Sequence, residues 1–291
     1  MKTSLITFVL AVGMTTVGLG ASAEAELKKI EQDWLDALPR LASECADQWS
    51  LVLEDPIDTP HSLVIPAGDV VLKLNAPSHH EADTEADALD RWAGHGAVQL
   101  RARDDARRAL LSERCVPGTQ LWDAGVDEAD VVAELLPRLQ IHAGERHPFM
   151  LVFEQADRWA ENVPRWYAAA GNPFERSLLD AALDVYRTVD RSAEWLVNQD
   201  LHGGNVLRAS REPWLVIDPK PLVGERELEA SGLLRNADSP SLWLDVLADL
   251  GFDRERARGW GVAHNLAWAW DERDGWLEEH VEEARRILSA R

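Results

Sequence analysis

Residues 198–205 read Asn198-Gln199-Asp200-Leu201-His202-Gly203-Gly204-Asn205, and an apolar run from Trp214 to Ile217 follows them and leads to Asp218. The carboxylate of Asp200 and the amide of Asn205 thus lie close together in the chain, separated by four residues that include two glycines, which allow a tight turn. The second carboxylate ends a short apolar strand, which would hold it rigidly. This spacing predicts a pocket in which two carboxylates and an amide converge.

An Asp-Leu-x-x-x-Asn pattern followed by a strand that ends in Asp is typical of a kinase catalytic loop and the metal-binding Asp after it. Phosphoryl transfer needs charge neutralisation and alignment more than covalent chemistry. On this interpretation Asp200 accepts or orients the proton of the attacking hydroxyl, and Asn205 and Asp218 hold Mg²⁺ between the phosphates of ATP. The pattern alone is weak, and the interpretation requires a lysine on an earlier strand and a glutamate on the helix that follows it.

Candidates for both residues occur upstream. Lys73 lies in a β-rich apolar run, where a lysine on an edge strand facing water is the simpler alternative. The next segment, residues 80–92, has apolar residues at helical spacing, with Glu81 and Glu85 on one face. In a kinase the strand lysine binds phosphates and is oriented by such a glutamate. We take Glu85 as the partner and Glu81 as the alternative.

The chain changes character near residue 117. Before it, short β-rich runs separated by turn signals predict an antiparallel meander and a second hairpin behind a helical lead-in. After it, apolar positions recur at helical spacing. The expected elements are a lead-in helix over residues 24–49, strands over 51–53, 62–65, 69–74, 98–100 and 109–111, and helices over 80–92, 123–139, 149–166, 174–196, 240–250, 263–270 and 276–288.

These elements predict an N-terminal lobe over residues 24–116 and a helical C-terminal lobe over residues 117–291. The run from Glu113 to Gly118 breaks the β pattern and marks the boundary. In this position the backbone near Glu113 and Cys115 is expected to hydrogen-bond adenine, as a hinge between lobes does. No repeat or low-complexity linker separates the lobes, so they form one catalytic unit.

Charge and cysteine content limit the class of partner. With 30 basic and 51 acidic residues, the chain has a formal net charge of −21, which repels nucleic-acid phosphates. The charge suits a cationic ligand, or simply a well-solvated surface. Two cysteines are too few for a disulfide framework.

The first 23 residues are typical of a secretory signal, with an apolar stretch from Leu5 to Leu19 and small residues at 21–23. Glycine and threonine interrupt the stretch, which is shorter than the roughly 20 apolar residues of a membrane span. An ATP-dependent enzyme also requires the cytosol. We therefore expect a poorly ordered or signal-like start, a cytoplasmic location and no membrane association, with export as the alternative.

Taken together, the motifs resemble the streptomycin-type aminoglycoside and hydroxyurea phosphotransferases. The resemblance rests on residues 198–207, 213–220, 222–224 and 233–236, and upstream on 72–74 and 85–89. It implies an α+β, two-lobed protein-kinase-like fold with a small antiparallel sheet in the N-terminal lobe. It also implies an antibiotic-resistance enzyme, expected to be a monomer, that uses ATP and Mg²⁺ to phosphorylate a hydroxyl of an aminoglycoside or of a small compound such as hydroxyurea.

The resemblance implies the roles already given to Asp200, Asn205, Asp218, Lys73 and Glu85. It further implies that Lys220 lies near the phosphates or the substrate and that Glu229 supports the loop after the metal site.

The chain departs from the family pattern in two places. Asn198-Gln199 stands where the family has His-Gly, so the amide of Asn198 is expected to brace the loop. Residues 54–66 contain no glycine, so the grip on ATP is expected to rely on the strand lysine and Mg²⁺. These departures leave a non-catalytic nucleotide-binding or drug-binding relative as the alternative.

Overall fold

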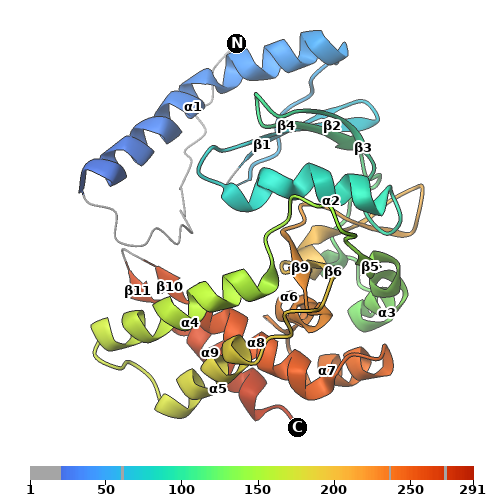
Figure 1. The fold of residues 1–291 in the computed structure, drawn as a ribbon. Coiled ribbons are helices and arrows are strands. Elements are labelled where there is room, and N and C mark those ends of the chain that lie inside the picture. The colour runs from blue at the N-terminus through green and yellow to red at the C-terminus, as the bar shows by residue number, and fades with distance from the viewer. Residues whose placement is uncertain (1–20, 60–61, 236, 272–273) are drawn as a thin grey trace. The chain divides into compact units, whose positions relative to one another are not determined.

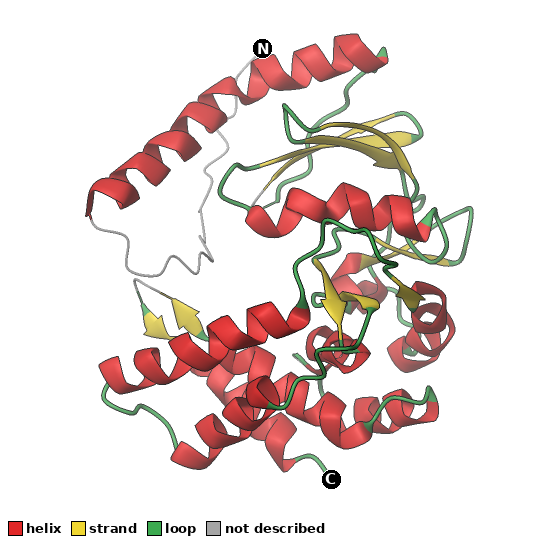
Figure 2. Ribbon diagram, in the orientation of Figure 1, coloured by secondary structure: helices red, strands yellow, loops and turns green. Residues whose placement is uncertain are grey.

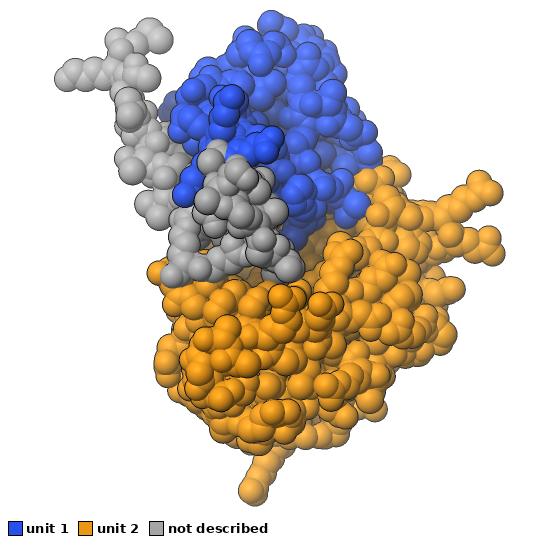
Figure 3. Space-filling view, turned by 60° about the vertical axis from the view of Figure 1, so that its left-hand side comes forward, with its two compact units in different colours: residues 1–86, 99–114 blue, residues 87–98, 115–291 orange. Residues whose placement is uncertain are grey.

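The structure, a computed structural model, describes residues 21–59, 62–235, 237–271 and 274–291. The chain divides into two compact units, coloured blue and orange in Figure 3. Unit 1 comprises Met1–Ala86 and Gln99–Arg114, and unit 2 comprises Asp87–Val98 and Cys115–Arg291. Residues 1–20 of the predicted signal-like segment lie outside the described residues. Its last three residues, 21–23, begin the first helix.

Unit 1 consists mainly of a long helix and a four-stranded antiparallel sheet (Figure 1). The helix is α1 (Ala21–Trp49), and the strands, in sheet order, are β1 (Ser62–Ala67), β2 (Val70–Asn75), β4 (Ala109–Glu113) and β3 (Leu100–Asp104). Gly68 adopts a positive φ of 65° in the two-residue turn between β1 and β2, a conformation that favours glycine.

A single apolar core joins α1 to the sheet. The helix contributes residues at helical spacing, and β2 contributes Leu72 and Leu74, both 0% exposed. Because successive strand residues point to opposite faces, burying these two leucines directs Lys73 to the other face of the sheet. The helix residues of the core are Trp34, Leu38, Ala42 and Cys45.

Unit 2 contains most of the helices, shown red in Figure 2, with short strands among them. Its strands are β5 (Ile141–His142), β6 (Trp195–Asn198) and β9 (Pro221–Gly224) in one sheet, and the hairpins β7 (Val206–Arg208) with β8 (Trp214–Val216) and β10 (Trp270–Asp271) with β11 (Gly275–Trp276). Its helices are α3 (Glu128–Leu139), α4 (Val152–Ala169), α5 (Arg176–Arg187), α6 (Ala230–Leu234), α7 (Pro240–Asp249), α8 (Arg254–Trp268) and α9 (Glu278–Ser289). Helix α8 packs against α5, α6 and α9.

Two predicted elements are wrong, and the strand expected over 98–100 is displaced to Leu100–Asp104. Residues 51–53 form no strand; Val52 is exposed, whereas Leu51 and Leu53 pack against the core as a half-buried connection. The helix expected over 174–196 ends at Arg187, and its last apolar residues form β6, which pairs with β5 and β9. Periodicity does not distinguish a short buried strand from the end of a helix.

The two compact units differ from the predicted lobes mainly in one segment, because residues 87–98 group with unit 2. They include most of α2 (Glu85–Trp92), which follows a 3₁₀ turn over His80–Thr84. The indole of Trp92 donates to the Leu139 carbonyl at 2.9 Å, and the Val98 N–H donates to the Val216 carbonyl at 3.0 Å. These hydrogen bonds join the segment to unit 2. They link residues far apart in the chain, so a division of the sequence into two continuous lobes does not predict them.

No helix within the described ranges has both the length and the apolar character needed to cross a membrane.

Replacing Leu72 by alanine is expected to destabilise the protein by about 2–5 kcal/mol, because it leaves a cavity beneath the central strand. Chemical denaturation measures the change. Val52→Ala, at a position 86% exposed, serves as the control and should change the free energy of unfolding by about 0.5 kcal/mol or less. Equal effects of the two substitutions would contradict the core described for unit 1.

Candidate active site

Unit 1 contains a buried ion pair between β2 and the start of α2. The Nζ of Lys73 lies 2.9 Å and 2.7 Å from the two carboxylate oxygens of Glu85, and the side-chain amide of Asn75 donates to the same carboxylate at 3.1 Å. Glu85 is 3% exposed, whereas the Glu81 side chain is 41% exposed and lies near His79. The structure therefore places Glu85, rather than Glu81, on Lys73.

Glu113 ends β4 and is committed to the sheet. Its N–H donates to the Gln99 carbonyl at 2.9 Å, and its carboxylate accepts the Gln99 N–H at 3.0 Å. The Glu113 N–H is therefore engaged within the sheet, and a contact of the backbone near Glu113 with adenine stays a prediction. Cys115 is half-buried in unit 2, and a backbone contact to adenine at this residue stays a prediction.

In unit 2, strand β6 leads into the loop that carries Asp200. Asn198, at the end of β6, is 0% exposed and pairs with Pro221 of β9. Its side-chain Oδ1 accepts the N–H groups of Asp200 at 3.2 Å and of Lys220 at 3.0 Å. One amide oxygen therefore holds together the two segments that bear the candidate residues.

Gln199, which together with Asn198 departs from the family pattern, also has a buried hydrogen-bond partner. Its Oε1 lies 3.2 Å from Nε2 of His264, on the buried helix α8. Burial keeps the pKa of His264 well below its ordinary value, so this imidazole is neutral and its Nε2–H donates to the amide oxygen.

The carboxylate of Asp200 is bound by one cation on each oxygen. Lys220 Nζ lies 2.8 Å from Oδ2, and Arg235 Nη1 lies 3.1 Å from Oδ1. The side chain of Asp200 is only 7% exposed. A buried charge requires such partners, and here two cations that are far from Asp200 in the sequence provide them.

Asn205 and Asp218 lie on paired backbone. The N–H of Ile217, just before Asp218, donates to the Asn205 carbonyl at 2.9 Å. The Asn205 Nδ2 donates to the Asp200 carbonyl at 3.2 Å, which orients its amide. An amide oxygen and a carboxylate are hard oxygen ligands that suit Mg²⁺, which also takes water and phosphate oxygens. Across the described ranges no group of three His, Cys, Asp or Glu side chains has the arrangement of a metal site formed by protein alone.

The two glycines of the loop are required by close packing. Neither has a positive φ; instead, a Cβ on Gly203 would lie 2.2 Å from the ring of Trp122. Trp122 stacks on His202 at 4.8 Å. The Nδ1 of His202 accepts the Gly204 N–H at 3.1 Å, and burial lowers its pKa despite the charge of Asp200. The loop therefore presents a neutral imidazole beside the carboxylate.

Glu229 holds the backbone at the end of β6, just before the Asp200 loop. It is 0% exposed, and its Oε1 accepts the Asn198 N–H at 3.2 Å. Burial raises its pKa to about 8, against the lowering effects of the Asn198 hydrogen bond and of Arg226. The sequence predicts support of the loop after the metal site, whereas the contact is to the strand before the catalytic loop.

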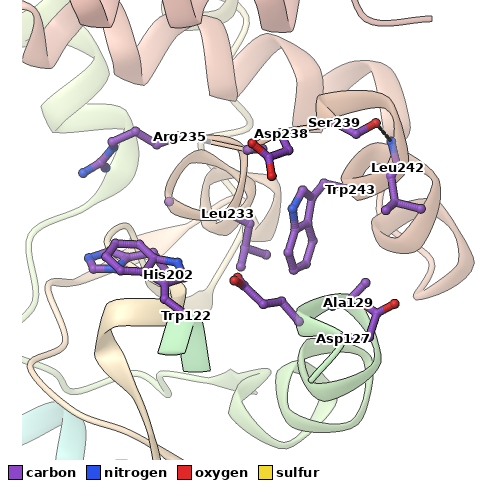
Figure 4. A pocket seen from close by; sticks show the side chains of 14 residues that line it. Trp122, Asp127, Ala129, His202, Leu233, Arg235, Asp238, Ser239, Leu242 and Trp243 are labelled. Carbon is purple, nitrogen blue, oxygen red and sulfur yellow. Dashed lines mark hydrogen bonds between the residues drawn. The ribbon is translucent and has the colours of Figure 1, made fainter. Parts of the chain in front are cut away.

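A cavity of about 540 Å³ opens beside this loop within unit 2. In Figure 4 the rings of Trp122 and His202 overlap, and Asp238 and Trp243 project into the space between α3 and α7. Burial raises the pKa of Glu128, which also lines the cavity, and the charges of Asp238 and Asp127 raise it further. The cavity thus combines aromatic and acidic walls.

Sequence reasoning missed Arg235 and the acids of this cavity as site residues. Arg235 stands in one of the stretches on which the family resemblance rests, but its charge partner is Asp200, 35 residues earlier. Glu128 and Asp238 have no local signature, because solvated helix ends carry similar residues.

Comparison with known proteins places this geometry in context. Residues 49–275 match the family model described as aminoglycoside/hydroxyurea antibiotic resistance kinase. The chain is 34% identical to a streptomycin 6-kinase of Streptomyces glaucescens, over 88% of this chain and 90% of the relative. It is 32% identical to a hydroxyurea phosphotransferase of Kitasatospora aureofaciens, over 94% and 88% respectively.

Among solved structures, a choline/ethanolamine kinase family protein from Mesorhizobium loti superposes with a TM-score of 0.62 at 11% identity. The match covers 86% of this chain and 95% of that protein. The predicted α+β protein-kinase-like fold is confirmed.

The raised pKa of Glu229 predicts how the stability of the protein depends on pH. Between its ordinary pKa of 4.5 and about 8, the folded state keeps a proton that the unfolded chain has lost. This group therefore lowers the free energy of unfolding as pH rises through that window, by at most about 1.4 kcal/mol per pH unit, and stops doing so above it.

Glu229→Gln removes this dependence. Thermal melts from about pH 5 to about pH 8 should show the variant gaining stability relative to the wild type as pH rises. The exposed Glu278→Gln should follow the wild type. Parallel curves for the wild type and Glu229→Gln would show that Glu229 is ionised in the folded protein.

Proposed function

Because the chain belongs to the aminoglycoside/hydroxyurea antibiotic resistance kinase family, we propose that it transfers a phosphoryl group from ATP to a hydroxyl of a streptomycin-type aminoglycoside. The resemblance predicted from the sequence is confirmed by the match to residues 49–275. The protein is thus a small-molecule phosphotransferase. The observation that carries the choice of acceptor is the acidic, aromatic cavity next to the Asp200 loop.

In the proposed reaction Asp200 orients the acceptor hydroxyl and receives its proton. Lys73, held by Glu85, binds phosphate oxygens of ATP. Asn205 and Asp218 are the residues that would hold Mg²⁺, which neutralises phosphate charge when bound. The hydrogen bonds of Asn198 and Gln199 support a catalytic loop in spite of the departure from the family pattern, which disfavours the non-catalytic alternative.

The cavity supports a cationic acceptor. Streptomycin carries guanidinium groups, which pair well with carboxylates and stack on aromatic rings. Glu128 and Asp238 supply carboxylates, and Trp122 and Trp243 supply rings. Two residues of the cavity wall, His202 and Arg235, also lie next to the Asp200 carboxylate, so an acceptor bound here is close to the proposed base.

Hydroxyurea is a second candidate acceptor, because a hydroxyurea phosphotransferase is among the relatives. It is small and neutral, and nothing in it requires the acids of the cavity. We further propose that the enzyme acts in the cytoplasm, where ATP is available, and functions as a monomer. The net charge of −21 supports a cationic small molecule over nucleic acid.

Asp200→Asn is expected to lower the rate of streptomycin phosphorylation by about 10²-fold or more, because the hydroxyl loses its proton acceptor. ATP binding should persist, since Lys73 and Glu85 are untouched. ADP release measures turnover and calorimetry measures ATP binding. The exposed Asp184→Asn is the control, and turnover by Asp200→Asn at the wild-type rate would exclude Asp200 as the base.

Glu128→Gln and Asp238→Asn are each expected to raise KM for streptomycin by about tenfold, as for the loss of a charge-assisted contact. Asp130→Asn, an exposed residue on the same helix and outside the cavity, makes the same change in net charge and is the control. KM for hydroxyurea should not change in any variant. If streptomycin KM is the same in all three variants, the acceptor binds elsewhere.

A further inference from the structure

We propose that Arg235 is a positioning residue for phosphoryl transfer: it fixes the Asp200 carboxylate through Oδ1, while Lys220 releases Oδ2 to the acceptor hydroxyl. This inference rests on the proposed function and assigns different roles to the two cations of the site. Both bind the same carboxylate in the structure, at 3.1 Å and 2.8 Å. Their surroundings distinguish them.

Arg235 is held rigidly. Its guanidinium lies over the ring of Trp268 at 4.3 Å, and its side chain is only 12% exposed. It caps the C-terminus of α6, which packs so closely on the loop that a Cβ on Gly232 would lie 2.3 Å from the Leu201 carbonyl oxygen. Backbone packing and ring stacking therefore fix this cation with respect to Asp200.

Within the described ranges, the guanidinium of Arg235 has one hydrogen-bonding partner. Its Nη1 donates to Asp200, while Nε and Nη2 are buried and, among the described residues, have no hydrogen-bond partner. A guanidinium usually uses several of its five donors. Here the remaining donors cannot hold Arg235 elsewhere, so the contact with Asp200 and the Trp268 ring determine where the guanidinium lies.

The side chain of Lys220 is flexible enough for its ammonium group to change partner. Its backbone N–H is anchored to Asn198, but the ammonium group ends a flexible four-carbon chain and lies 4.9 Å from the Trp268 ring centre. It is two residues from Asp218, a proposed metal ligand at the phosphates. A phosphate oxygen is a competing anion for an ammonium group, and moving Lys220 to it would leave Oδ2 of Asp200 available.

The transfer then balances as follows. The acceptor oxygen forms a bond to the γ-phosphorus, and the bond from that phosphorus to the β,γ-bridging oxygen breaks, leaving its electron pair on ADP. The hydroxyl proton passes to Oδ2 of Asp200. Arg235 stays on Oδ1 throughout and keeps the carboxylate aligned with the hydroxyl, and misalignment by about 1 Å is enough to cost about 10²-fold in rate.

Four variants test these roles in the wild-type background with ATP and streptomycin. Arg235→Gln should lower kcat by about 10²-fold and leave KM for both substrates within about threefold, because a group that acts only on alignment contributes little to binding. Arg235→Lys should recover part of kcat. Lys220→Gln should lower kcat and also weaken ATP binding. The exposed Arg187→Gln should match the wild type.

Chemical rescue distinguishes a positioning role of Arg235 from a purely structural one. Methylguanidine added to Arg235→Ala should restore part of kcat, because it replaces the missing guanidinium over Trp268, and it should not alter the melting temperature of the variant. The proposal is wrong if Arg235→Gln keeps wild-type kcat. It is also wrong if kcat and melting temperature fall together and neither lysine nor methylguanidine restores activity.

A wrong assignment of the acceptor gives a different result from a wrong assignment of Arg235. If the wild type phosphorylates neither streptomycin nor hydroxyurea, the acceptor assignment is wrong, and the same variants are compared by their transfer to water, measured as phosphate release from ATP. A loss in Arg235→Gln that methylguanidine reverses in Arg235→Ala supports the positioning role in that assay too. Equal hydrolysis by the wild type and Arg235→Gln overturns it.

Discussion

A carboxylate that is 7% exposed has to be compensated, and the compensation of Asp200 organises the site in unit 2. Lys220 comes from the segment before β9 and Arg235 from the end of α6, so pairing them with Asp200 brings three separate parts of the chain together. The same requirement explains the packing around them. Gly232 lets α6 approach the loop, and Trp268 provides a ring for both cations.

Neutral polar groups complete this arrangement without adding charge. Burial keeps His264 neutral while it hydrogen-bonds to Gln199, and burial raises the pKa of Glu229 beneath Asn198. The backbone of the loop is therefore braced by groups that do not compete electrostatically with the ion pairs at Asp200. Asn198 and Gln199, which depart from the family pattern, are both part of this bracing. Their amides hold the loop by hydrogen bonds alone.

The charge of the protein acts locally. A net charge of −21 is a property of the whole surface, whereas the cavity is lined by three acids, Asp127, Glu128 and Asp238. Burial raises the pKa of Glu128, and the charges of Asp238 and Asp127 raise it further. A bound cation would relieve that repulsion. Next to the cavity, Lys220 and Arg235 place their positive charges on the two oxygens of the Asp200 carboxylate. In the proposed reaction the acidic cavity suits a cationic acceptor, and Lys220 is the cation that moves to the phosphate.

Local spacing and alternation in the sequence were enough to locate the Asp200 loop, the strand of Lys73 and the helix of Glu85, because they specify short motifs and single elements. The fold class followed from the family resemblance that these motifs carry. The sequence also identified Glu85 as the first choice for Lys73. Which charges meet depends on tertiary contacts, since Arg235 and Asp200 are separated by 35 residues and no local pattern links them. Tertiary contacts also group residues 87–98 with unit 2, and the residues expected to end a long helix form strand β6 instead. Those outcomes depend on hydrogen bonds and packing between distant segments, which sequence periodicity does not encode.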